Sequence, residues 1–525
     1  MKNSKYFLLA ALGLMAVPAL AQETYQDTKF AENSLTGTAR YVGMGGAMEA
    51  LGADISTIST NPAGVGLFRK NQVSVSAGVV AQTDAEIQLG FDNTVPKLKA
   101  DKSRPSFDQI GIVWSAARNG SGSYLNLAFN YHKSTNFNQI LSAANYLQGA
   151  SQSKLTSAKY DLAQQSPKDY ADMIWTAVDA NYEGLMASDG QTKTMNYYDG
   201  QSFRYSQYQK GYIGEYDFNV SGSINNRVWL GFTVGIHDVN YQSNSQYSEN
   251  LIADADATAA SQEILKIDGT GFDVKAGVIF RPVEESPFRI GAYVNSPVYY
   301  DLKMKGVADL KLRDGANKDD NSNGSNYSYR LNTPWKAGVS LGHTVGNYLA
   351  LGATYEYAWY DHMDNRIKDG GYYDAWYGDY YETSSSDEYM NDHTRETLKG
   401  VSTLKLGLEY KPLSMLSIRL GYNYVSPMFE ESGYRDQSIP SPGTAYATSS
   451  DYTNWKATNR FTAGVGFNFQ NWAFDVAYQY SAQKGDFYPF MSYYDSKDSS
   501  YDCVAPATEV KNNRHQVLMT LAYKF

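Results

Sequence analysis

The feature that most constrains this chain is a period-two alternation of apolar residues with polar or small ones, repeated in many separate runs. In the last run every odd residue is apolar: Val517, Met519, Leu521, Tyr523 and Phe525. The run Leu416–Tyr424 reads the same way. Successive side chains of a β-strand point to opposite faces, so each run predicts a strand with one apolar face.

The length of the runs and the position of their aromatic residues distinguish between two kinds of β protein. Soluble sandwiches alternate in the same way, because one face of each sheet packs inward. Here, however, the runs reach about 9–11 residues or more, the length that a tilted strand needs to cross a bilayer. Aromatic residues stand at the run ends, where a transmembrane barrel has its interface girdles: Trp359, Tyr422, Tyr424, Tyr480, Tyr523 and Phe525. A membrane barrel is favoured.

The strands and their connections follow a regular order. Candidate strands begin near Gln72, Phe107, Tyr124, Gly214, Val228, Gly271, Phe288, Tyr327, Tyr348, Thr397, Leu416, Arg460, Trp472 and Arg514. Every second connection is long, near 84–105, 135–211, 242–267, 305–326, 361–396, 430–459 and 483–513. Outer-membrane barrels have an even number of strands, short periplasmic turns and long extracellular loops. The sequence therefore predicts an all-β fold, a 14-stranded antiparallel transmembrane barrel over residues 71–525.

The first 21 residues predict a signal peptide. Lys2 and Lys5 precede an apolar run, and Ala19-Leu20-Ala21 forms a small-residue cleavage site. The alternative, a retained helical anchor, is disfavoured because the run is shorter than the roughly 20 residues that span a bilayer. Export in a Gram-negative bacterium would place the barrel in the outer membrane.

The overall composition excludes several classes of function. The chain has 45 Lys and Arg against 55 Asp and Glu, a formal net charge of −10, which argues against a nucleic-acid partner. The single Cys503 rules out an internal disulfide and metal sites built on cysteine. No apolar run after the signal peptide reaches the length of a membrane helix.

Residues 22–70 do not alternate, although their composition is not that of a disordered segment. They contain Gly43-Met44-Gly45-Gly46-Ala47 and Asn61-Pro62-Ala63-Gly64, in which glycines permit tight turns and Asn-Pro is a turn signal. From the residues alone, two readings stay open: a plug folded inside the barrel, or a flexible periplasmic tail.

These two motifs resemble those of the FadL family of outer-membrane transporters for hydrophobic compounds. The resemblance continues in Thr333–Gly338, in Arg460–Gly466 and in the C-terminal strand from His515. It implies a 14-stranded barrel and a hatch, formed by residues 22–70, that fills the lumen. It also implies a ligand that lands between extracellular loops, enters a pocket and leaves through a gap in the wall. In some members a kinked third strand makes that gap, but here Tyr124–Ser134 contains neither Gly nor Pro.

The long loops offer low-specificity candidates for ligand contact. One loop has a helical spacing of apolar residues over Pro167–Met186, and another is crowded with Tyr and Asp. The candidates are Trp175, Tyr182, Trp376 and Tyr377. The alternative reading is that these side chains pack on their own loops. Four charges placed on the lumenal face are candidates for anchoring the hatch or a ligand headgroup: Lys336, Glu356, Arg419 and Asp475.

Two motif matches and the positions of the histidines point to no chemistry. Asp319-x-Asn321-x-Asn323-Gly324 copies the start of a calcium loop, but its twelfth position is Arg330, where a bidentate Glu is needed. Gly338-x-Ser340-x-Gly342 lies in an alternating strand, not in the strand–turn–helix of a hydrolase elbow. The six His are scattered. We therefore predict no metal, no cofactor and no enzyme activity.

The leading hypothesis for function is uptake of a hydrophobic small molecule, such as a long-chain fatty acid. The alternative is a barrel of the same architecture that acts in protein secretion or surface-protein attachment and binds protein cargo. The expected partners are outer-membrane lipid, the ligand, and the barrel-assembly machinery, which would act on the terminal strand with Tyr523 and Phe525. We expect a monomer.

Overall fold

A computed structural model of the chain describes residues 23–525, except 33, 84–101, 119–122, 166–177, 180, 183–196, 253–256, 315–316, 377 and 496–498. The predicted signal peptide lies outside the described residues. Within the described part no helix is long and apolar enough to cross a membrane.

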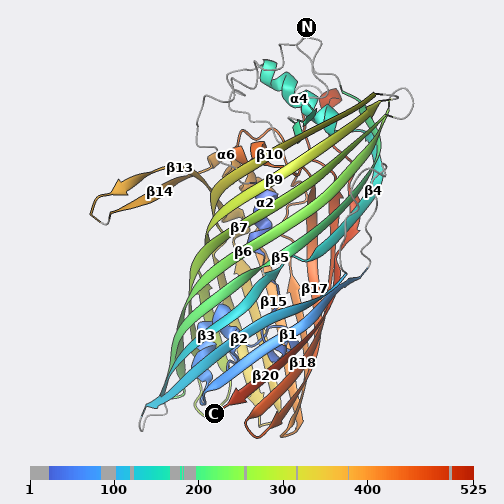
Figure 1. Cartoon of the computed structure of the whole chain (residues 1–525). Helices are drawn as coiled ribbons and strands as arrows, with labels where there is room; N and C mark the ends of the chain where they lie inside the picture. The colour runs from blue at the N-terminus through green and yellow to red at the C-terminus, as the bar shows by residue number, and fades with distance from the viewer. Residues whose placement is uncertain are drawn as a thin grey trace.

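The helices lie in the N-terminal segment and in the long connections. They are α2 (Thr24–Ala31), α3 (Ala39–Gly43), η1 (Ile55–Ser59), η2 (Pro62–Leu67), α4 (Gln152–Gln165), η3 (Tyr360–His362), α6 (Glu388–Thr397), α7 (Pro442–Tyr446) and η4 (Ser499–Tyr501). The rest of the regular structure is β-strand (Figure 1).

The strand segments form one antiparallel sheet. They are β1 (Gln72–Thr83), β2 (Ser103–Arg118), β3 (Ser123–Asn136), β4 (Gln139–Gly149), β5 (Asp199–Ile224), β6 (Val228–Ile252), β7 (Thr258–Phe280), β8 (Arg289–Asn295), β9 (Tyr299–Asp314), β10 (Asn317–Asn332), β11 (Lys336–Val345), β12 (Leu349–Ala358), β13 (Asp364–Asp374), β14 (Asp379–Ser386), β15 (Val401–Leu413), β16 (Leu416–Val425), β17 (Tyr452–Phe469), β18 (Trp472–Tyr488), β19 (Thr508–Lys511) and β20 (Asn513–Lys524).

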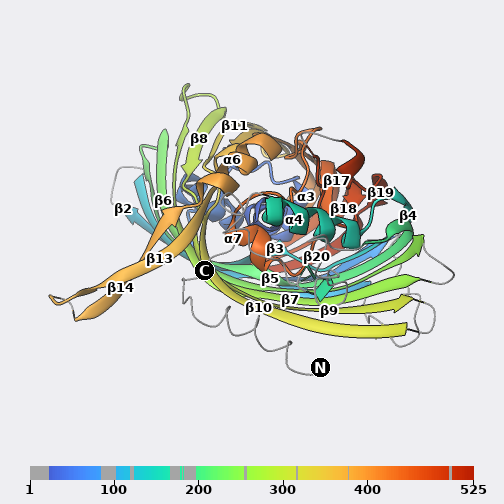
Figure 2. The same cartoon turned by 90° about the horizontal axis from the view of Figure 1, so that it is seen from above.

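The barrel wall has 14 strands, because several segments are pieces of one strand. β4 continues β3 along β5, β9 continues β8 along β7, β11 continues β10, and β19 runs into β20 along β18. β13 and β14 form a hairpin that projects away from the wall (Figures 1 and 2). The barrel closes where β1 pairs with β20, from Gln72 opposite Lys524 to Thr83 opposite Asn513. The predicted fold class and strand number are confirmed.

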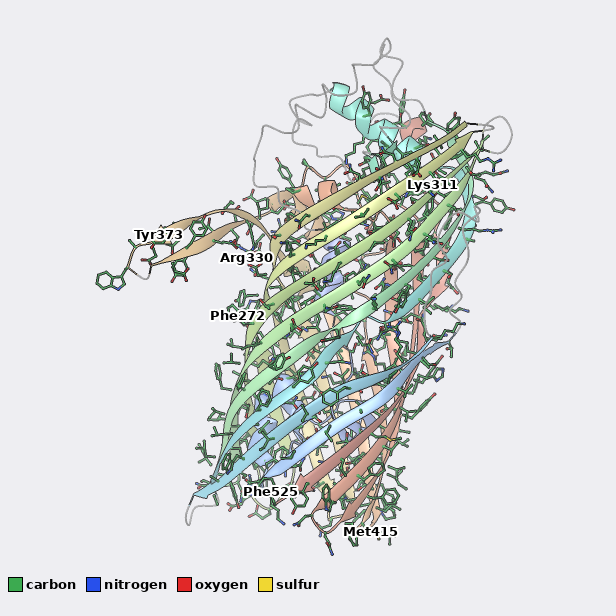
Figure 3. The ribbon with its side chains drawn as sticks, viewed as in Figure 1. Phe272, Lys311, Arg330, Tyr373, Met415 and Phe525 are labelled. Atoms are coloured by element: carbon green, nitrogen blue, oxygen red, sulfur yellow. The ribbon has the colours of Figure 1, made fainter. Side chains whose placement is uncertain are left out.

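The outer face of the wall is apolar over a belt around the barrel. Large side chains there are strongly exposed, including Leu127, Phe218, Phe232 and Leu420. Aromatic residues stand near the belt's edges, such as Phe272 on one side and Phe525 on the other (Figure 3). This is the surface of a strand-built membrane protein, in which lipid replaces the packing partner that a soluble sheet would need.

The short connections lie at one end of the barrel with the C-terminus, and the long ones at the other (Figure 1). Asn225 and Asn226 both have positive φ, 50° and 52°, as the two central residues of a type I′ hairpin require. Two predicted long loops are wrong, because residues 242–267 and 305–326 largely continue the strands β6, β7, β9 and β10. The wall therefore extends beyond the belt on that side.

Candidate functional site

The described N-terminal segment, Glu23–Phe68, lies inside the barrel, with α2 toward the loop end and the later turns toward the short-turn end (Figure 1). Each short element starts at a side-chain cap. Thr38 caps α3 by accepting from the Tyr41 N–H, Asp54 caps η1, and Asn61 caps η2 by accepting from the Ala63 N–H at 3.2 Å. Pro62 occupies the first helical position, where its missing N–H costs nothing.

The Asn61-Pro62 turn lies against three wall glycines on neighbouring strands. A Cβ added at Gly277 would come within 2.0 Å of Asn61 Oδ1, and one at Gly231 within 2.3 Å of the Pro62 carbonyl carbon. At Gly291 a Cβ would approach Asn61 Nδ2 at 3.0 Å. The wall here is therefore shaped to receive this turn.

A second glycine-lined contact receives the Gly43–Ala47 turn, in which Gly45 has a φ of +63°. A Cβ at Gly421 would lie 2.1 Å from the Gly45 nitrogen, and one at Gly352 would lie 1.9 Å from the Ala47 carbonyl oxygen. Both parts of the predicted plug motif, the glycine turn at Gly43–Ala47 and the Asn61-Pro62 turn, therefore contact the barrel wall.

A buried carboxylate ties this segment to the wall. Glu49 is fully buried and accepts from Lys405 Nζ at 2.8 Å, Thr354 Oγ1 at 2.8 Å and Tyr41 Oη at 3.0 Å. Burial, and then the neighbouring Glu49, raise the pKa of Tyr41 well above its usual range. Tyr41 therefore stays a neutral donor to Glu49.

A chain of ion pairs makes a second tie. Arg40 Nε lies 3.1 Å from Glu409 Oε2, which also accepts from Arg419 Nε at 2.6 Å. Arg419 Nη1 in turn contacts Asp475 Oδ1 at 2.6 Å. Two of the four predicted lumenal charges, Arg419 and Asp475, thus belong to the network that holds the N-terminal segment.

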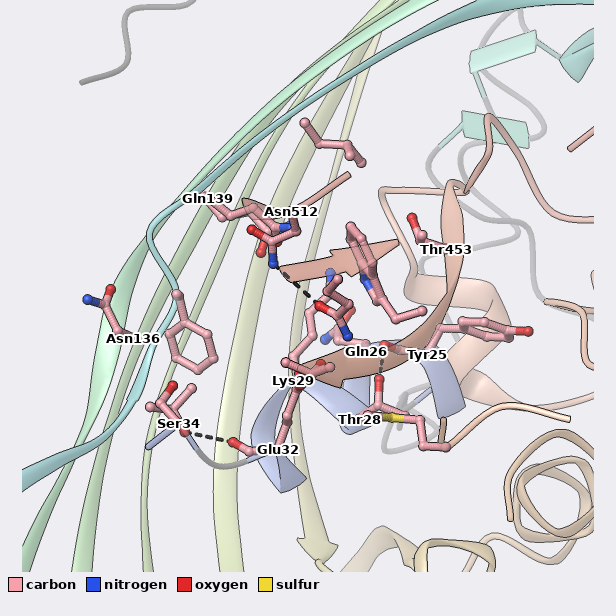
Figure 4. A pocket seen from close by; sticks show the side chains of 18 of the residues that line it. Tyr25, Gln26, Thr28, Lys29, Glu32, Ser34, Asn136, Gln139, Thr453 and Asn512 are labelled. Carbon is pink, nitrogen blue, oxygen red and sulfur yellow. Dashed lines mark hydrogen bonds between the residues drawn. The ribbon is translucent and has the colours of Figure 1, made fainter. Parts of the chain in front are cut away.

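Above α3 the lumen contains an upper cavity of about 160 Å³ that surrounds α2 (Figure 4). Its lining is mixed. Apolar side chains such as Phe137, Met428 and Trp455 alternate with amides and charges, including Gln139 and Lys29. The chamber is more polar than a pocket for a plain hydrocarbon.

Two arginines of the upper cavity have no carboxylate oxygen within 4 Å among the described residues. Arg460 donates to Asn423 Oδ1 at 2.8 Å, and Arg514 donates to Asn512 Oδ1 at 2.9 Å. Burial raises the pKa of Glu32, and Arg460 and Arg514 oppose that rise from a distance.

A lower cavity of about 130 Å³ adjoins the upper one. Five residues line both cavities: Glu32, Ser34, Leu35, Met428 and Arg460. The other two predicted lumenal charges, Lys336 and Glu356, line the lower cavity. The short link between α2 and α3 is therefore part of the partition between the chambers.

One wall of the lower cavity carries a buried charge cluster that no sequence motif indicates. Lys275 Nζ contacts Glu215 Oε1 at 2.6 Å, Asp273 Oδ1 at 2.9 Å and Asp217 Oδ1 at 3.0 Å. His132 and His237 flank the carboxylates. These residues come from β3, β5, β6 and β7, which are neighbours in the wall.

Besides the single-residue gap at Asn512 between β19 and β20, two breaks in the described wall strands lie beside the cavities. The third wall strand breaks at Phe137 and Asn138, just beyond the stretch without Gly or Pro, and faces the upper cavity. Two neighbouring strands break side by side at Pro297 and Pro334, where proline supplies no N–H. Hydrogen bonds across the breaks at Pro297 and Pro334 include the one that the Thr333 N–H donates to Val298 O at 3.1 Å.

The two loop candidates that the structure describes, Tyr182 and Trp376, line neither cavity. Tyr182 is fully buried and donates to Glu249 Oε1 at 3.1 Å. Trp376 is 89% exposed near the tip of the β13–β14 hairpin. Trp175 and Tyr377 lie outside the described residues. Ser340 is buried within β11, as the strand reading of that motif predicts.

No protein-family model and no curated protein matches this sequence. Among solved structures, a Pseudomonas aeruginosa FadL homologue is 14% identical, with a TM-score of 0.51 over 94% of this chain and 99% of that one. The chain has the fold of a FadL-type barrel. The Ralstonia pickettii toluene transporter TbuX is 13% identical over the same shares, with a TM-score of 0.48. The Pseudomonas putida toluene transporter TodX is 12% identical, again over the same shares, with a TM-score of 0.45.

Proposed function

We propose that this FadL-type barrel takes up hydrophobic small molecules across the outer membrane of a Gram-negative bacterium, with residues 22–70 as its hatch. The observation that carries the proposal is the pair of adjoining lumenal cavities, divided in part by the link between α2 and α3. Apolar molecules do not partition into an aqueous channel but do enter a partly apolar chamber.

The substrate class that best fits the upper cavity is an amphiphile with an anionic head, such as a long-chain fatty acid. Arg460 and Arg514 offer charge to a carboxylate, and Phe137 and Met428 offer apolar contact. A cavity of about 150 Å³ holds a molecule the size of benzene. A long acyl chain would therefore extend past Glu32 into the lower cavity.

Passage then requires the partition to move. Glu32, Ser34 and Leu35, which line both cavities, belong to the N-terminal segment, so a shift of α2 would join the two chambers. The lower cavity is lined by Ser296, Val298 and Thr333 at the proline breaks. This break gives the ligand a route into the wall where the strand ladder is already interrupted.

The first test is mass spectrometry of small molecules retained by the purified, detergent-exchanged protein, followed by binding of a labelled long-chain fatty acid. We expect the double variant R460Q/R514Q to bind the acid at least about tenfold more weakly, since each charged hydrogen bond contributes about 1.5–3 kcal/mol. Toluene, which has no head group, should bind both proteins alike. The control K368Q changes a cation on the projecting hairpin and should bind as the wild type does.

Unchanged fatty-acid binding in R460Q/R514Q would contradict the anionic-head assignment. A barrel that retains no lipid and copurifies with a surface protein would instead support the secretion role.

A further inference from the structure

The proposed function gives no role to the buried cluster around Glu215, although the cluster lines the lower cavity. The three carboxylates and one lysine of the cluster carry a net charge of −2 when all three carboxylates are ionised and both imidazoles are neutral. Charged groups in such a setting are costly unless they are compensated. A divalent cation would bring the cluster to neutrality.

The contacts of the imidazoles in this cluster are too long for ordinary hydrogen bonds. His237 Nε2 lies 3.4 Å from Asp273 Oδ1, and its Nδ1 lies 4.0 Å from Glu215 Oε2. Hydrogen bonds from nitrogen to oxygen are normally 2.7–3.2 Å. Two ligands held at about 2.1 Å by one tetrahedral zinc ion lie about 3.4 Å apart, which follows from the bond lengths.

A second observation is independent of the charge count. Both ring nitrogens of His237 lack a hydrogen-bond partner among the described residues, although the side chain is only 4% exposed. Buried polar atoms are nearly always bonded, and neutral imidazole is a common metal ligand. The ring also lines the lower cavity, so an ion could reach it.

We propose that Glu215, His237 and Asp273 bind a divalent transition-metal ion in the wall of the lower cavity. One donor atom from each of the three lies within 4.8 Å of the others. All three line the cavity, which leaves the remaining coordination positions to water or to a passing ligand.

The neighbouring residues position these ligands. His132 Nε2 lies 3.5 Å from Glu215 Oε2, and His132 Nδ1 lies 3.6 Å from Asp217 Oδ2. Both contacts are longer than ordinary hydrogen bonds, so His132 would orient Glu215 once a bound ion has drawn the cluster together. Lys275 contacts the opposite oxygen of Glu215, so one carboxylate can bridge the lysine and the ion.

The test uses the full-length barrel in detergent, stripped with a chelator and titrated with Co²⁺. We expect about one Co²⁺ per chain by elemental analysis, with the visible absorption bands of a low-symmetry cobalt site. H237Q should lower the affinity at least about a hundredfold and abolish those bands. H132Q, which changes only a positioning residue, should lower it about tenfold. The control H362Q removes an exposed histidine and should bind as the wild type does.

Folding of each variant is checked by its heat-dependent shift in gel electrophoresis. If H237Q does not fold, the near-isosteric D273N takes its place. A wild-type barrel that binds no Co²⁺ overturns the proposal, and so does equal binding by wild type and a folded H237Q or D273N.

Discussion

At the scale of single residues, the molecule relies on buried charges that its own N-terminal segment neutralises. Glu49 supplies the one carboxylate oxygen that lies within 4 Å of Lys405 Nζ among the described residues. The lysine is 8% exposed and the glutamate is fully buried. Removing one member of such a pair leaves an uncompensated charge, which costs roughly 3–5 kcal/mol.

We therefore expect E49Q to loosen the N-terminal segment while the barrel stays folded. In planar-bilayer recordings the wild type should pass little current and E49Q should pass ions. The control E430Q breaks the exposed pair with Lys399 and should leave the current unchanged. An E49Q barrel as tight to ions as the wild type would show that Glu49 does not hold the hatch.

Glu249 gives the loop end a dependence on pH. It lies beyond the apolar belt, and burial raises its pKa to about 7. An unfolded glutamate has a pKa of about 4.3, so the folded state favours the protonated form. This stabilisation is fully present below about pH 4 and is lost as the pH rises through 7.

The buried thiol of Cys503 lies in the same apolar cluster as Tyr247, whose hydroxyl donates to Glu249. The rate at which a thiol reagent labels Cys503 therefore measures local opening of the loop end. We expect the labelling rate of wild type divided by that of E249Q to be near one at about pH 4. At pH 8 the ratio should be higher by well over about tenfold, because each pH unit between the two pKa values increases opening about tenfold. A ratio that does not change with pH would contradict the assignment.

At the scale of elements, the fit between the Asn61-Pro62 turn and its glycine-lined wall makes a sharp prediction. A methyl group at Gly277 would overlap Asn61 Oδ1, and overpacking of this kind costs about 1–3 kcal/mol. G277A should therefore expose the N-terminal segment to protease while the barrel resists. G324A, where the nearest atom would lie 3.3 Å away, serves as the control. If the N-terminal segment resists protease equally in G277A and G324A, the Asn61-Pro62 turn can shift away from the wall without loss of stability.

The wall strands were predictable within the belt and not beyond it. Inside the belt, Leu230, Phe232 and Val234 face lipid, so alternation is visible in the sequence. Farther along β6 the outward positions are Asn240, Gln242 and similar polar residues, and the apolar period disappears although the strand continues. Strand pairing with β5 and β7, rather than lipid, stabilises this extension.

The candidate site was predictable only where a motif is continuous in sequence. The glycine turn and Asn61-Pro62 could be recognised as short strings. The cluster of His132, Glu215, His237 and Asp273 could not, because its members lie on four strands and meet only through the pairing of the wall. The histidines are far apart in the sequence, so their positions do not indicate that His132 and His237 lie close together in the wall.

At the scale of the whole molecule, the β13–β14 hairpin stands apart from the wall (Figure 2). Its ladder to the wall is the short pairing of Asp364–Arg366 with Arg330–Asn332. Deletion of residues 368–384 should therefore leave the heat-dependent gel shift and fatty-acid binding unchanged. Loss of a copurifying surface protein on deletion would support the secretion alternative, and loss of barrel folding would show that the hairpin is structural.

The shared lining of the two cavities has a consequence for the cell that carries the barrel. If the partition moves as proposed, a ligand from outside would fill the upper cavity before the lower one opens to it, and the pair of cavities would work like an airlock. Small hydrophilic toxins gain no continuous aqueous path from such a device. An outer membrane could then hold many copies of this barrel and still resist polar antibiotics.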